Sequence, residues 1–198
     1  TTTFTGGTFE AAASNTYAKS FVSGSGGAII DNKSYNPTMS GVFSGSGGLT
    51  FANSGSGGSA TLSGTNTYTG ATTVGNGAHL KVTGSIANSS GLTVQSGGTL
   101  SGSALKTTSK LPTTTFTGGT LEIESSDTYQ KSFVSGSGGT NLNSNSYTTT
   151  LSGDISGSGG LSISNSGSGG LINLSGANTY TGATTIGNGT HLKVNGSI

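Results

Sequence analysis

The sequence of 198 residues contains no cysteine, no tryptophan and no arginine, and it has only two prolines. Without cysteine, a disulfide framework is excluded as the source of stability. Charged residues make up only 7% of the chain, and the formal net charge is +1. Binding to nucleic acid or to anionic membranes needs clustered lysine and arginine, so the sequence predicts neither kind of partner. No apolar run approaches the roughly 20 residues that span a bilayer.

Glycine, serine, threonine and asparagine dominate what is present, with 38 glycines and a hydrophobic fraction of 29%. Glycine and β-branched residues disfavour helix, and no segment keeps a helical apolar period. Short runs alternate apolar and polar residues instead, as in His79–Val82 and in residues 121–124. Ser-Gly-Ser-Gly-Gly clusters, for example at 44–48 and 156–160, separate these runs and are typical of turns. The pattern predicts an all-β protein made of strands of three to five residues.

The chain also matches itself without a gap when it is shifted so that Phe4 falls on Phe116. The same shift places Tyr68 on Tyr180 and His79 on His191, and about two-thirds of the overlapping positions are identical. We therefore divide the chain into a complete repeat, residues 1–112, and a second, truncated repeat, residues 113–198. A long fixed period is typical of repeat arrays, so we expect the sequence to be a piece of a longer array, with any targeting signal or anchor outside it.

Repetition favours a β-helix (β-solenoid) over a sandwich or barrel, because each coil of a solenoid can pair with similar coils above and below it. We predict a right-handed parallel β-helix built from the 112-residue repeats, with roughly 20–25 residues per coil and about eight to ten coils. The inward positions of the alternating runs form the predicted core: Phe9, Phe43, Leu49, Phe51, Leu62, Val74, Leu80, Val82, Leu92, Val94, Leu100, Leu121, Ile155, Leu161, Ile163, Leu174, Ile186, Leu192 and Val194.

One motif resembles a known family. Leu-Ser-Gly-Thr-Asn-Thr-Tyr-Thr-Gly-Ala-Thr-Thr-Val at 62–74, preceded by Gly-Ser-Gly-Gly-Leu-Thr at 45–50 and followed by His-Leu-Lys-Val at 79–82, occurs again at 174–186. It resembles the passenger-associated repeat of bacterial autotransporters. The resemblance covers a little over a third of each repeat. One departure is Asn53-Ser-Gly-Ser-Gly-Gly-Ser, which stands where the family commonly has a shorter turn with lysine.

The resemblance implies a secreted, extracellular protein of the bacterial cell surface, attached to the membrane only through an outer-membrane barrel domain beyond this sequence. Our leading hypothesis is a structural repeat segment of a surface adhesin, acting as a rigid stalk and as a surface for self-association in aggregation or biofilm. The expected partners are other copies of the chain or neighbouring repeats, and surface glycans or host proteins are the alternative. The sequence predicts no cofactor.

Catalysis is not predicted, because the six carboxylates and two histidines do not form a set. Glu10 and Glu122 are repeat equivalents and lie several coils apart, as do His79 and His191. We expect both histidines to face solvent, and we expect no Ser/His/Asp set and no metal site. Glu122 and Glu124 share a strand face, which we interpret as a solvated outer face. A polysaccharide-active enzyme is the least favoured hypothesis.

The tyrosines are the remaining candidates for ligand contact. Tyr17 and Tyr35 recur as Tyr129 and Tyr147, and tyrosine on a polar surface can bind glycans or proteins. These four are our candidate contact residues, although we favour the alternative that they lie at coil corners and cover the edge of the core. For Tyr68 and Tyr180, inside the family motif, we favour the corner, with the hydroxyl bonded to a turn carbonyl. Thr-x-Thr motifs are too sparse for an ice-binding face.

Overall fold

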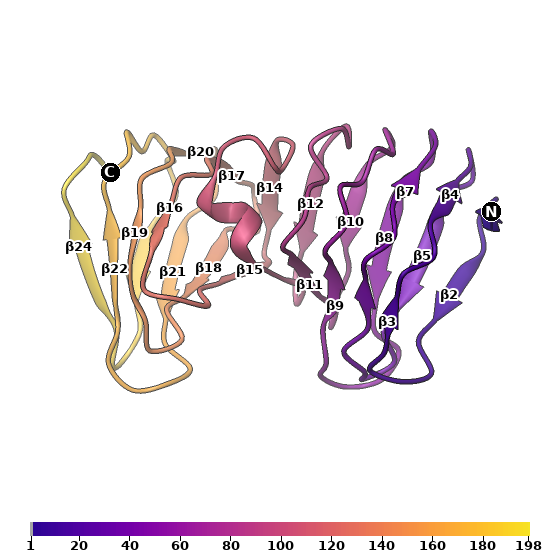
Figure 1. The fold of residues 1–198 in the computed structure, drawn as a ribbon. Helices are drawn as coiled ribbons and strands as arrows, with labels where there is room; N and C mark the ends of the chain where they lie inside the picture. Colours follow the sequence, from indigo (N-terminus) through magenta and orange to yellow (C-terminus); the bar gives the residue numbers. More distant parts are fainter. Residues whose placement is uncertain (1) are drawn as a thin grey trace.

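The computed structural model describes residues 2–198, which wind into a parallel β-solenoid (Figure 1). All pairings between its named strands are parallel. One coil takes about 21 residues, and the longest sheet has nine strands. The prediction of an all-β solenoid with coils of this length is confirmed. Among residues 2–198, no helix is long and apolar enough to cross a membrane.

Each coil contributes to three faces in turn. Face 1 is an eight-stranded sheet: β2 (Thr8–Glu10), β5 (Ala28–Asp31), β8 (Leu49–Ala52), β10 (Thr72–Val74), β12 (Leu92–Gln95), β14 (Thr114–Thr117), β17 (Phe133–Ser135) and β20 (Ile155–Ser156). Face 2 is a nine-stranded sheet: β3 (Thr16–Tyr17), β6 (Thr38–Met39), β9 (Ala60–Leu62), β11 (His79–Val82), β13 (Thr99–Ser101), β15 (Thr120–Glu122), β18 (Thr140–Asn143), β21 (Leu161–Ser164) and β23 (Thr184–Ile186).

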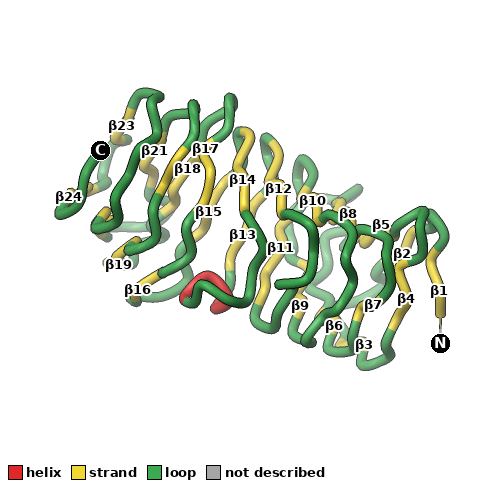
Figure 2. Tube along the Cα trace, turned by 90° about the horizontal axis from the view of Figure 1, so that it is seen from above, coloured by secondary structure: helices red, strands yellow, loops and turns green. Residues whose placement is uncertain are grey.

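Face 3 is interrupted in its middle. It consists of a three-stranded sheet near the N-terminus and a four-stranded sheet near the C-terminus: β1 (Thr2–Phe4), β4 (Phe21–Ser23) and β7 (Phe43–Ser44), then β16 (Thr128–Tyr129), β19 (Thr148–Leu151), β22 (Leu171–Leu174) and β24 (His191–Val194). Between them the chain follows residues 63–71 and 83–91 and the short 3-10 helix η1 (Ser103–Lys106). Figure 2 shows η1 in red, the one helical segment of the described chain.

The core is a set of side-chain stacks that run along the solenoid axis. On face 2, for example, Leu80, Leu100, Leu121 and Leu142 are paired from coil to coil, and each is at most 2% exposed. Because the strand period is two residues, inward and outward side chains alternate, and the register keeps every inward residue over another inward residue. One or two apolar side chains per strand, together with buried hydroxyl residues such as Thr72 and Thr114, therefore suffice for a continuous core despite the low hydrophobic fraction.

Most of the predicted core residues are buried, and four depart from the prediction. Phe9 and Leu192 are only partly buried, and Ile186 and Val194 are 53% and 38% exposed. All four lie in the first or last coil of the described chain, where β23 and β24 each pair with one neighbour. A stacked side chain with a neighbour on one side only keeps its other side open to solvent.

The 112-residue period does not correspond to a whole number of coils. On face 1, five successive strand pairings lead from Thr8 to Thr115, which lies at the matching position five coils later. The repeat equivalent of Thr8 is instead Thr120, which lies on face 2. One sequence repeat therefore advances the chain by five coils and one further face. The structural unit is the coil of about 21 residues, so the 112-residue repeat is not confirmed as a structural unit.

Candidate functional site

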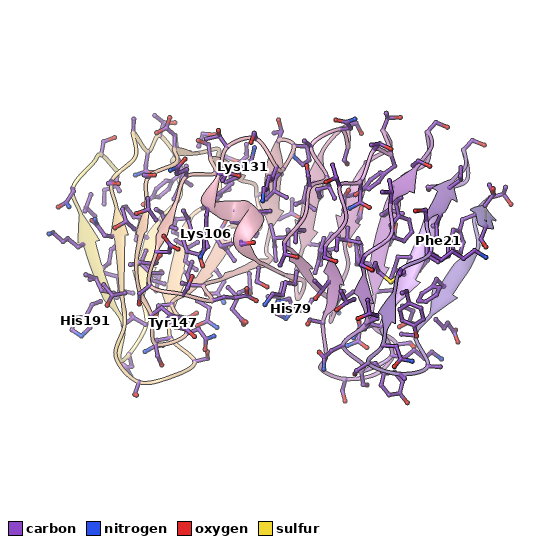
Figure 3. All side chains as sticks on the ribbon, in the orientation of Figure 1. Phe21, His79, Lys106, Lys131, Tyr147 and His191 are labelled. Carbon is purple, nitrogen blue, oxygen red and sulfur yellow. The ribbon has the colours of Figure 1, made fainter. Side chains whose placement is uncertain are left out.

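The four candidate tyrosines lie in different environments. Tyr35 and Tyr147 are 41% and 36% exposed, on corner turns between strands, and Figure 3 shows Tyr147. Tyr17 packs edge-to-face on Phe9 with ring centroids 4.9 Å apart. Tyr129 is only 2% exposed and its hydroxyl accepts the backbone N–H of Glu124, so its ring belongs to the core. The hypothesis of ligand contact therefore depends on Tyr35 and Tyr147.

These two tyrosines face different directions, since the repeats are rotated by one face. Tyr35 lies on the edge between faces 1 and 2, because β5 precedes it and β6 follows it. Tyr147 follows β18 and precedes β19, so it lies on the edge between faces 2 and 3. A single ligand on one side of the rod would not meet both side chains.

The motif at residues 62–74, which resembles the autotransporter repeat, has a structural role. Tyr68 is fully buried, and its hydroxyl lies 2.6 Å from Oγ1 of Thr72, which in turn lies 2.9 Å from Oγ of Ser89. Tyr180 repeats this contact with Thr184. The ring therefore covers the core as expected, but the predicted bond to a turn carbonyl is wrong: the partner is a threonine hydroxyl. Face 3 has no strand in this coil, and the ring of Tyr68 covers the core at that place.

Asn66, in the same motif, joins three coils. Its side-chain oxygen accepts the N–H of Phe43 at 2.9 Å, and its amide group donates to the carbonyls of Gly64 and Ser85 at 3.0 and 3.1 Å. Asn66 is 2% exposed, and its amide adds to the backbone bonds that the N–H groups of Asn66 and Thr67 donate to the carbonyls of Ser85 and Phe43. The most specific motif of the sequence thus serves to close the coil.

A polar cluster on face 2 departs from the sequence prediction. Nε2 of His79 lies 2.7 Å from Oγ of Ser101, and the Ser101 hydroxyl donates to Oε1 of Glu124 at 2.9 Å. Lys81 forms an ion pair with the same carboxylate oxygen at 2.9 Å. His79 thus lies on the outer side of its strand as expected, but its ring is half-buried and hydrogen-bonded and not free in solvent, and Glu124 is not a freely solvated side chain. Sequence spacing could not reveal this cluster, because it joins three successive coils.

The order of groups in this cluster does not suit nucleophilic catalysis. In a catalytic triad the histidine lies between the serine and the carboxylate, whereas here the serine lies between the other two. Since the Ser101 hydroxyl donates its one proton to Glu124, Nε2 of His79 must carry a proton and donate it to Ser101. That nitrogen cannot act as the base for Ser101, which is also fully buried. Among residues 2–198, no group of His, Cys, Asp and Glu side chains could hold a metal ion.

A further carboxylate, that of Asp31, also holds the structure together. Oδ1 of Asp31 accepts the N–H groups of Lys33 and Ser54, each at 3.0 Å. At the repeat-equivalent position, Oδ1 of Asn143 accepts the N–H groups of Asn145 and Ser166 in the same arrangement. An amide therefore replaces the carboxylate without loss of contacts, so the charge of Asp31 is dispensable there.

The outer surface of face 1 carries a ladder of hydroxyl groups. Thr50, Thr73, Thr93 and Thr115 occupy matching outward positions in four successive coils. The spacings between them along the chain are unequal, which concealed the ladder in the sequence. Each hydroxyl can both donate and accept a hydrogen bond, and no charged residue interrupts these four positions.

Two open grooves lie on the edges of the solenoid beside such hydroxyl groups. The first groove, of about 450 Å³, lies where face 3 turns into face 1 and is lined by Gly26, Gly48, Thr50 and Thr73 among others. The second, of about 360 Å³, lies where face 1 turns into face 2 and includes Gly138, Gly160, Ser162 and Thr185. We call them groove N and groove C. Neither is lined by a charged side chain.

In comparisons with known proteins, no family model, no curated protein and no solved structure matched the chain. The fold and the surface chemistry described above are therefore the basis for any functional assignment.

We expect the polar cluster to make stability depend on pH. Burial of the ring lowers the pKa of His79, and Lys81 adds to this, whereas the carboxylates of Glu122 and Glu124 oppose it. The unfolded chain, with a histidine pKa near 6.5, then binds the proton more readily than the folded chain. Stability should fall as the pH drops below about 6.5, by at most about 1.4 kcal/mol per pH unit.

The measurement is the urea midpoint between pH 7.5 and 5.5 for the wild type and for His79→Gln, which keeps an N–H donor toward Ser101. The variant should lose less stability over this range. His191→Gln, at the repeat-equivalent position in the last coil and outside the cluster, is the matched control (Figure 3). Equal slopes for wild type and His79→Gln would contradict the argument.

Proposed function

We propose that this chain is a structural repeat segment of a secreted adhesin of the autotransporter type at the bacterial cell surface, with right-handed coils. It acts as a rigid spacer whose polar sides associate with other copies of the chain. The observation that carries the proposal is a pair of uninterrupted parallel sheets, of eight and nine strands, with an almost uncharged, hydroxyl-rich exterior. The proposal assigns no catalytic step and no cofactor.

Stiffness follows from the pairing of the coils. An interior strand such as β11 is hydrogen-bonded to β9 on one side and to β13 on the other, so bending the rod would strain two ladders. At a strand spacing of about 4.8 Å, about nine coils give a rod about 40 Å long. Length then grows in proportion to the number of coils, which is the property that a spacer needs.

The exterior suits contact between like surfaces. Only three ion pairs occur among residues 2–198, namely Lys33–Glu10, Lys81–Glu124 and Lys106–Asp127. With a net charge of +1, two copies repel each other little. Hydroxyl and amide groups are self-complementary, because each can donate to and accept from its equivalent on another molecule. Many weak contacts along a straight side then add up.

The experiment is sedimentation velocity over a wide concentration range. Open strand edges in the last coil could also associate end to end, so a variant with Ile186→Lys and Val194→Lys is compared with the wild type. Both side chains are exposed in the last coil, and lysine there should block end contacts. Under the proposal the variant still associates, and raising the salt concentration has little effect.

If the wild type and the lysine variant both stay monomeric, the self-association part of the proposal is wrong and only the role as a spacer remains. In that case the exposed Tyr35 and Tyr147 favour the second candidate, a glycan- or receptor-binding module. Glycan capture that is lost in Tyr35→Ala and Tyr147→Ala would then support this second candidate.

A further inference from the structure

Groove N and groove C are the same feature in the two sequence repeats. Gly26, Gly48 and Thr73 in groove N correspond to Gly138, Gly160 and Thr185 in groove C, at equivalent positions of the second repeat. Thr50 corresponds to Ser162, so the hydroxyl is kept although the residue changes. The main difference is Ile29, which becomes Asn141.

The two grooves point to different sides of the rod. Groove N lies on the edge between faces 3 and 1, and groove C on the edge between faces 1 and 2. The rotation by one face per repeat produces this difference. Because groove C lies five coils and one face after groove N, the two grooves are also about 26 Å apart along the axis, at about 4.8 Å per coil. Equivalent surface features of the two repeats are thus related by a screw operation, which is a rotation about the solenoid axis combined with a shift along it.

We propose that grooves N and C are two equivalent docking sites for further copies of this chain, so that each molecule joins two neighbours on different sides. This inference rests on the proposed self-association and adds to it the number of neighbours that each molecule binds, namely two. Pairing through one straight side would stop at a dimer, whereas two sites on adjacent edges extend the assembly in more than one direction.

The chemistry of the grooves favours a second copy as the occupant. Neither groove has a charged side chain, so an acidic or basic ligand would find no counter-ion. Both combine exposed hydroxyl groups with backbone at glycine corners, where the absence of side chains lets another chain approach closely. The chain itself offers matching hydroxyl groups on the same edges and nearly no net charge.

The arrangement of the sites determines the form of the assembly. Two sites related by a screw operation do not lie on a common two-fold axis, so contacts through both cannot close into one symmetric dimer. Successive contacts instead give open-ended lateral assemblies. At high concentration we expect a series of species larger than the dimer.

The test blocks one groove at a time in the protein whose end contacts have been blocked as above. Thr50→Glu changes groove N and Ser162→Glu changes groove C; both residues are exposed on strands, so each variant should fold. Thr16→Glu, at an exposed strand position outside both grooves, is the matched control. Circular dichroism checks the fold, and sedimentation velocity measures the size of the species.

We expect trimers and larger species for the parent and for Thr16→Glu, dimers as the largest species for each single groove variant, and monomers for the double variant. A parent that stops at dimers would overturn the two-site inference and leave the proposed self-association in place. Single variants that keep the full range of sizes would overturn it as well. A monomeric parent would remove self-association itself.

Discussion

Replacing Gly47 with alanine should prevent the solenoid from forming, or should destabilise it by more than about 4 kcal/mol. Gly47 lies on the edge between β7 and β8, and a Cβ atom there would overlap the carbonyl oxygen of Gly24 in the preceding coil. That oxygen belongs to the backbone and cannot move aside unless the coil spacing changes. Since the spacing is set by two ladders of hydrogen bonds, the clash would separate neighbouring coils over several residues.

The matched control is Gly91→Ala. A Cβ atom at Gly91 would have its nearest neighbour, the carbonyl oxygen of Thr113, at 3.9 Å, which is an ordinary contact. Gly91→Ala should change stability by less than about 1 kcal/mol. Soluble expression, the circular dichroism spectrum and the thermal midpoint compare the two variants. A Gly47→Ala protein with a β-rich spectrum and a midpoint within a few degrees of the wild type would contradict the predicted packing of the coils.

The fold could be predicted from the sequence because its pattern is local. In His79–Val82, Leu80 and Val82 are fully buried while His79 and Lys81 face outward, as simple alternation requires. Substitutions between the repeats gave the same information, since Phe51 and Ile163 differ in shape but both point inward and are buried. Glycine clusters marked the turns. These signals lie within a few residues of each other, so no knowledge of the coil length was needed.

Properties that depend on the coil length could not be predicted. The rotation of the second repeat by one face results from the division of the 112-residue repeat into coils of about 21 residues, with unequal turns between them. The threonine ladder from Thr50 to Thr115 and the contact between His79, Ser101 and Glu124 join residues that are 20 to 23 positions apart. An error of one residue in any turn would move an outward side chain to the inner side.

The tyrosines illustrate the same limit within one motif. Tyr68 was correctly predicted to cover the core from its place in the motif, but the partner of its hydroxyl is in the following strand and not in the turn. Tyr129 was a candidate for ligand contact and proved to be buried. Its strand is only two residues long, which is too short for alternation to show which residue points inward.

The second large effect is expected for Asn66→Ala, which should destabilise the protein by about 3 kcal/mol or more. The substitution removes three side-chain hydrogen bonds and leaves the buried N–H of Phe43 without a partner. A buried, unsatisfied donor costs about 1–3 kcal/mol by itself. The carbonyls of Gly64 and Ser85 each lose one of two donors and keep a backbone N–H, that of Ser85 and of Asn66 respectively. Face 3 has no strand in this coil, and the acceptor for the N–H of Phe43 is the amide oxygen of Asn66 and not a strand carbonyl.

Two further variants separate the hydrogen bonds from the volume of the side chain. Asn66→Asp keeps the shape and one acceptor but places a carboxylate against two carbonyl oxygens, so it should be at least as destabilising as alanine at pH 7. Asn15→Ala removes an exposed asparagine and should cost less than about 0.5 kcal/mol. Urea denaturation followed by circular dichroism measures all three. If Asn66→Asp were as stable as the wild type, the amide would not be bridging the coils, and the role assigned to the shared motif would have to be abandoned.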